Sequence, residues 1–131
     1  MKEITGHTLF AAVRIFVGIT MAFAHGVGKV PPSEGLIGAI GTFGFPLPLV
    51  MAWAVGVIEL IGGIFIAMGL FTRVMGGLWV AVMGGAAFVI HAADPFAKKE
   101  MALLYLAFGV LYLAQGGGRY AIDTWIARKR A

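Results

Sequence analysis

Four blocks of apolar residues, separated by short polar stretches, make up most of the chain and predict four helices. About 20 apolar residues cross the hydrocarbon core of a bilayer as one helix. The predicted helices cover residues 6–25, 49–71, 74–93 and 100–115. The sequence therefore predicts an all-α integral membrane protein, a bundle of four transmembrane helices in the single domain 1–131.

The polar stretches predict how the helices are connected. Residues 26–48 contain four prolines and form an outer loop, in which Ser33 is the predicted N-cap of a short helix ending near Thr42. The second and third blocks are separated by a tight turn, so their helices are antiparallel neighbours. Three glycines, 116–118, end the fourth helix, and residues 119–131 predict a short interfacial helix.

The composition supports this class and excludes several functions. Of the 131 residues, 60% are apolar and 12% are charged, with a mean hydropathy of +0.94, whereas soluble domains carry about 25% charged residues. The net charge of +4 arises from basic residues at segment ends and at the C-terminus, so we expect no nucleic-acid partner. The absence of cysteine excludes dithiol catalysis, thiolate metal sites and iron–sulfur clusters, and no metal site is predicted.

Basic residues outside the predicted helices indicate the orientation of the bundle. Six lie on the side that carries the N-terminus, the tight turn between the second and third helices, and the C-terminal tail. Three lie on the other side. The six are Lys2, Arg73, Arg119, Arg128, Lys129 and Arg130; the three are Lys29, Lys98 and Lys99. Because cytoplasmic loops carry an excess of lysine and arginine, both termini are predicted to be cytoplasmic.

Two charged residues fall inside the predicted helices, Arg14 in the first and Glu59 in the second. A charge at the bilayer centre costs roughly 3 kcal/mol on insertion scales, so each residue needs a partner. With a rise of about 1.5 Å per residue, the two residues are predicted to lie at similar depth. We therefore predict an Arg14–Glu59 ion pair, which either fixes helix register alone or forms the floor of a polar cavity.

Three titratable residues, His25, His91 and Glu100, are predicted at the outer ends of their helices and form a candidate catalytic cluster. Two histidines at one level could ligate haem iron, or act with Glu100 as a proton relay at a quinone headgroup. Alternatively, they are interfacial residues bonded to loop carbonyls. Two histidines are a weak signal for haem, so haem is disfavoured and quinone remains open. Tyr105 and Tyr112 lie two turns apart on one face of the fourth helix. They either pack against neighbouring helices or contact a cofactor.

Short motifs extend over nearly the whole chain in a fixed order: Arg14, His25-Gly26 with Lys29, FGFP at 43–46, ELIGG at 59–63, GLFTR at 69–73, His91, Glu100, and GGRYAID at 117–123. Together they resemble the DoxX family of small four-helix membrane proteins. The resemblance implies a bundle in the bacterial cytoplasmic membrane and a link to subunits of thiosulfate:quinone oxidoreductase and other membrane oxidoreductase complexes. Ala121 departs from the family pattern, which often has serine there.

Two functional hypotheses follow. In the first, the chain is a subunit of a quinone-linked oxidoreductase that uses the outer cluster and a membrane or periplasmic oxidoreductase partner. In the second, it is a non-catalytic membrane scaffold, chaperone or assembly factor whose polar core only specifies the fold. Both place the chain in a lipid bilayer, and both are compatible with a homo-oligomer.

Overall fold

All secondary structure in the described part of the chain is helical, as expected. The computed structural model describes residues 2–131, with side chains from Thr5 onward, so the side chain of Lys2 in the charge count lies outside the described part. The helices are α1 (Lys2–Thr20), the π-helical η1 (Met21–Gly26), the 3₁₀ segment η2 (Val27–Lys29), α2 (Glu34–Thr42), α3 (Pro48–Met68), α4 (Thr72–Gly85), the π-helical η3 (Ala86–Ile90), α5 (Phe96–Gln115) and α6 (Ile122–Arg130).

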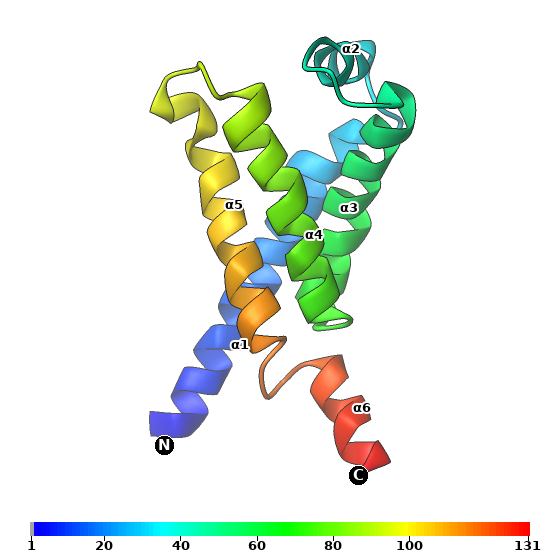
Figure 1. Cartoon of the computed structure of the whole chain (residues 1–131). Coiled ribbons are helices and arrows are strands. Elements are labelled where there is room, and N and C mark those ends of the chain that lie inside the picture. Colours follow the sequence, from blue (N-terminus) through cyan, green and yellow to red (C-terminus); the bar gives the residue numbers. More distant parts are fainter. Residues whose placement is uncertain (1) are drawn as a thin grey trace.

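The long helices form one bundle with two distinct ends (Figure 1). The chain begins and ends at one of them, the terminal end, where the α3–α4 turn and α6 also lie. The opposite, distal end carries α2 and the connection into α5. This arrangement confirms that α3 and α4 are antiparallel neighbours. The prediction that the terminal end faces the cytoplasm remains a prediction.

Within the described part of the chain, three helical stretches are long and apolar enough to cross a membrane: Thr5–Lys29, Pro48–Met68 and Thr72–Ile90. Helix α5 has a comparable length of 20 residues. It carries Lys98, Lys99 and Glu100 near its start, so its crossing of the bilayer remains a prediction. The short α6 is present as expected, with the Lys129 ammonium 4.0 Å from the Trp125 ring centroid, but its contact with a membrane surface is likewise not established.

Several predicted helix boundaries differ from the structure, and two of the differences change the distal end. The first helix was expected to end at residue 25, but helical backbone continues through η1 and η2 to Lys29. The fourth helix begins at Phe96 instead of residue 100, directly after Pro95, because proline fits well just before a helix. Both extensions bring additional basic side chains onto helices at the distal end. The Ser33 cap is confirmed, since Ser33 Oγ accepts the Leu36 N–H at 3.2 Å.

Glycine contacts hold the helices together in two pairs. A Cβ atom built on Gly63 would lie 2.6 Å from the Gly18 carbonyl oxygen, and one on Gly76 would lie 2.8 Å from the Gly109 carbonyl oxygen. Real Cβ atoms are not found at such distances, so the α1–α3 and α4–α5 backbones are in direct contact. Small residues such as Gly63 and Gly76 permit this approach in membrane helices.

The core fills the space between the two helix pairs. Trp79 of α4 lies at its centre and makes edge-to-face contacts with Tyr105 and Tyr112 of α5, with ring centroids 5.7 and 6.3 Å apart. Met21 and Ile66 complete the packing from η1 and α3. This aromatic layer separates the distal half of the bundle from the terminal half.

Replacing Gly63 with alanine should destabilise the protein by about 1–3 kcal/mol, the usual cost of overpacking. The matched control is Gly85→Ala, because a Cβ there meets nothing within 4 Å; its effect should stay within about 0.5 kcal/mol. Unfolding of both variants in detergent measures the difference. Equal stability of the two variants would show that α1 and α3 do not pack backbone to backbone.

Candidate functional site

A cavity of about 180 Å³ lies in the distal half of the bundle, between η1, α3, α4 with η3, and α5. Its polar walls are His25, Lys29, Glu59, His91, Lys98 and Tyr105, and its apolar walls are Met21, Met83, Ala86, Met101 and Ala102. We call it the distal cavity. It contains most of the titratable side chains singled out from the sequence and is the candidate functional site.

A buried ion pair forms one wall of the distal cavity. Glu59 is 2% exposed, and its Oε2 accepts a hydrogen bond from Lys29 Nζ at 2.5 Å, while the Lys29 side chain is 33% exposed. Lys29 reaches this position because helical backbone continues past His25. Gly26 contributes as well, since a side chain there would collide with the Glu59–Leu60 backbone.

The predicted Arg14–Glu59 ion pair is therefore wrong. Arg14 is buried, but its Nη1 donates to the carbonyls of Ile66 (2.9 Å) and Ala67 (3.1 Å), and its Nη2 donates to the Tyr120 carbonyl (3.1 Å). The Ile66 and Ala67 carbonyls lie in the last turn of α3, where helix carbonyls lack intrahelical N–H partners, and Tyr120 lies in the connection from α5 to α6. Arg14 thus lies about two helical turns from the level of Glu59, toward the terminal end. The depth estimate failed because the first helical stretch runs from Lys2 through η1 and η2 to Lys29 and not over residues 6–25, which changes the distance of Arg14 from both of its ends.

Both cavity histidines are presented by π-helical segments. His25 lies within η1, and His91 follows η3 directly and donates its backbone N–H to the Ala86 carbonyl at 2.9 Å, a π-type bond across five residues. An inserted residue of this kind rotates the following side chains and is often found at functional sites. In this chain, both histidines next to such segments line the distal cavity.

Hydrogen bonds and ring contacts orient the polar walls. The His91 Nδ1 lies 2.7 Å from Asp94 Oδ2, and this hydrogen bond holds the pKa of the Asp94 carboxyl below its ordinary value of 3.8. An ionised Asp94 assigns the proton to Nδ1 and leaves His91 Nε2 as an acceptor. The Tyr105 hydroxyl donates to Thr20 Oγ1 at 3.2 Å, and the His25 ring stands edge-on to the Tyr105 ring at 5.3 Å.

The structure does not bring the whole predicted cluster together. His25, His91 and Tyr105 line the distal cavity, but Glu100 is exposed on α5 and is not part of the wall. Lys98, two residues earlier, lines the cavity instead. Tyr112 is buried in the aromatic core, away from the cavity. Glu100 is therefore removed from the candidate catalytic set, and Tyr112 from the candidate cofactor contacts.

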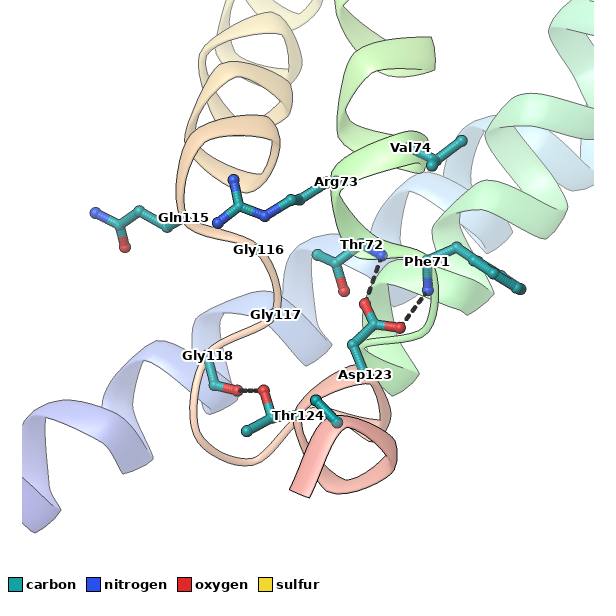
Figure 2. A pocket seen from close by; sticks show the side chains of 11 residues that line it. Phe71, Thr72, Arg73, Val74, Gln115, Gly116, Gly117, Gly118, Asp123 and Thr124 are labelled. Atoms are coloured by element: carbon teal, nitrogen blue, oxygen red, sulfur yellow. Dashed lines mark hydrogen bonds between the residues drawn. The ribbon is translucent and has the colours of Figure 1, made fainter. Parts of the chain in front are cut away.

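A second, more open groove of about 470 Å³ lies at the terminal end (Figure 2). Across this groove, the Asp123 carboxylate of α6 accepts hydrogen bonds from the backbone N–H groups of Phe71 and Thr72, each at 2.8 Å. Asp123 thereby caps the N-terminus of α4. Arg73 Nη1 donates to the Leu113 and Ala114 carbonyls at the end of α5. These charged groups satisfy helix ends, so the groove is a structural joint between α4, α5 and α6.

Comparison with known proteins now identifies the family. The family model described as DoxX matches residues 9–92, more than half of the chain. The chain belongs to the DoxX family. It is 34% identical over 115 residues to a Bacillus subtilis (strain 168) protein named "Putative oxidoreductase CatD", covering 87% of this chain and 84% of that protein.

A second relative comes from Haemophilus influenzae (strain ATCC 51907 / DSM 11121 / KW20 / Rd) and is named "Uncharacterized protein". It is 34% identical over 127 residues, which cover 91% of each chain. No solved structure matches the chain. The DoxX match includes the α1–α3 pair, the Lys29–Glu59 ion pair and His91, and it ends before α5 begins.

Sequence reasoning missed three features of this DoxX site: the role of Lys29, the role of Lys98, and the convergence of three methionines. Lys29 was assigned to a loop, although its spacing of four residues from His25 is the spacing of one helical face. That spacing was the available signal. Nothing in the local sequence indicates that Met83 and Met101, from different helices, line one cavity with Met21.

The Lys29–Glu59 pair should show strong energetic coupling. Lys29→Met leaves a buried carboxylate without a cation and should cost up to about 3–5 kcal/mol. Glu59→Gln should cost less, because the partly exposed Lys29 can turn its ammonium toward water. The double variant should lose less stability than the sum of the single losses, as measured by unfolding in detergent.

The control is the Arg14→Leu and Glu59→Gln pair. These residues do not touch, so their losses should add within about 0.5 kcal/mol. Additive losses for Lys29 and Glu59, together with coupling between Arg14 and Glu59, would contradict the structure.

Proposed function

We propose that this DoxX-family chain is a membrane subunit of a quinone-linked oxidoreductase system and that the distal cavity receives the quinone ring. The observation that carries the proposal is the convergence of Lys29, Glu59, His25, His91 and Tyr105 on one cavity of ring size. The oxidoreductase class is supported by the printed name of the Bacillus subtilis relative.

The cavity volume suits a single ring. An apolar protein cavity of about 150 Å³ accommodates benzene, and the distal cavity measures about 180 Å³. Drug-sized ligands occupy sites of about 300 Å³ or more, so a macrocycle such as haem does not fit. Met101 is half exposed, so part of the wall reaches the surface and leaves a route for a hydrocarbon tail into lipid.

The walls offer the contacts that a quinone requires. Its two carbonyl oxygens accept hydrogen bonds. The Lys29 ammonium, which gives only one of its three N–H groups to Glu59, and a ring N–H of His25 are donors at the cavity wall. The thioethers of Met21 and Met83 provide polarizable contacts for the ring face. Glu59 keeps the Lys29 ammonium in place.

Quinone reduction consumes two electrons and two protons. His91 is suited to exchange protons with the distal aqueous side, because Asp94 fixes its tautomer and its side chain is 38% exposed. The chain has no cysteine for thiol redox chemistry, so in this proposal the electrons come from a partner oxidoreductase. The ring receives them in the cavity and leaves as the quinol.

A non-catalytic scaffold or assembly factor is the second candidate. It is favoured by the terminal end, where Arg14, Arg73 and Asp123 all satisfy helix ends and serve no evident chemistry. In this alternative the distal cavity has no ligand, which makes quinone binding the observation that separates the two candidates.

The test uses duroquinone, a single-ring quinone without a tail, and the purified chain in detergent. Binding should quench the fluorescence of Trp79, which packs on Tyr105 of the cavity wall. Ala102→Phe fills the cavity without removing a charge and should weaken binding about tenfold or more, which corresponds to at least about 1.4 kcal/mol.

The matched control is Ala107→Phe, which adds the same ring to an exposed position of the same helix. This variant should bind duroquinone like the unmodified chain. No saturable binding, or equal binding by both variants, would overturn the quinone proposal and favour the scaffold.

A further inference from the structure

Three of the seven methionines, each from a different helical segment, line the distal cavity. They are Met21 of η1, Met83 of α4 and Met101 of α5. Met21 and Met83 are buried, whereas Met101 is half exposed. Core packing explains a buried methionine by itself. It does not explain why three thioethers and two imidazoles share the wall of one small cavity.

The histidines of this wall have the features of metal ligands. The ring of His25 contacts Tyr105 edge-on, and within the described part of the chain its nitrogens have no recorded hydrogen bond. His91 donates Nδ1–H to the Asp94 carboxylate. A ligating histidine almost always donates its second ring N–H to a carboxylate or carbonyl in this way, which orients the ring and raises its basicity.

The donor set selects the type of ion. Thioether ligands favour Cu(I), whereas hard divalent ions require carboxylate, carbonyl or water oxygens. Glu59 is already paired with Lys29, and Asp94 is held by His91. Lys98 adds a positive charge to the wall, which disfavours a divalent ion more than a monovalent one. The cavity is therefore matched to a soft ion of single charge.

We propose that the distal cavity binds Cu(I) through four ligands, the thioethers of Met21, Met83 and Met101 and the imidazole of His91, with His25 beside the ion in the same wall. Methionine side chains have three rotatable bonds, so the thioethers can reorient toward an ion in the cavity that all three line. The buried Glu59 carboxylate balances the Lys29 charge close to the ion. This site is a binding activity distinct from quinone chemistry and does not depend on it.

The experiment measures Cu(I) affinity by anaerobic competition with bathocuproine disulfonate, using the full-length chain in detergent without added quinone. The chain should bind one Cu(I), and Ag(I), a redox-inert soft ion, should compete for the same site. Zn²⁺ should not compete. Met83→Leu and Met101→Leu keep side-chain volume nearly constant and are tolerated in packed interiors, and each should weaken Cu(I) binding about tenfold or more. Asp94→Asn should weaken it about tenfold through His91.

Met68→Leu is the matched control. Met68 lies at the terminal end of α3, outside the cavity wall, so this variant should bind Cu(I) like the unmodified chain. The proposal is overturned if the folded chain binds no Cu(I) above a detergent blank, if Met68→Leu loses as much affinity as Met83→Leu, or if Zn²⁺ displaces the ion. A chain that binds Cu(I) but not duroquinone would support this site and reject the quinone proposal separately.

Discussion

Glu59 is a buried carboxylate within an apolar helix, and the arrangement of the distal half of the bundle provides its ionic partner. A charge in this position must have a partner nearby. Lys29 is that partner only because the first helix continues past His25 and because Gly26 allows its backbone to lie directly against Glu59 and Leu60. The same continuation places His25 on the cavity wall. One ion pair thus links helix length, helix contact and the position of the candidate site.

The charged side chains that contact the two ends of the bundle have different physical roles. At the terminal end, Arg14 and Arg73 satisfy carbonyls of α3 and α5, and Asp123 satisfies N–H groups of α4. These three side chains satisfy helix ends, and the groove between α4, α5 and α6 is a structural joint (Figure 2). At the distal end, the ion pair and the His91–Asp94 pair face a cavity. The aromatic layer around Trp79 separates the two groups.

The helices, the tight turn, the Ser33 cap and the close glycine contacts were predictable, because each depends on local composition or spacing. The Lys29–Glu59 pair was not predictable, because it depends on the first helical stretch continuing as far as Lys29. Helix boundaries are the least certain part of a sequence prediction. The π-helical segments before His91 and around His25 have no sequence signature and alter which side chains face inward. Glu100 was misplaced for a related reason: α5 begins four residues earlier and turns Lys98 toward the cavity.

The cation beside Glu59 determines which helices are held together in the distal half of the bundle. Solid-state NMR of the chain in lipid bilayers, with ¹⁵N-labelled lysine and arginine and ¹³C-labelled glutamate, reports this contact without perturbing the protein. The structure predicts dipolar coupling between Lys29 Nζ and Glu59 Cδ. It also predicts loss of this coupling in Lys29→Arg, which carries no lysine ammonium at that position. Coupling of Glu59 to an arginine nitrogen in the unmodified chain, or a Glu59 carboxyl with no basic neighbour, would contradict it.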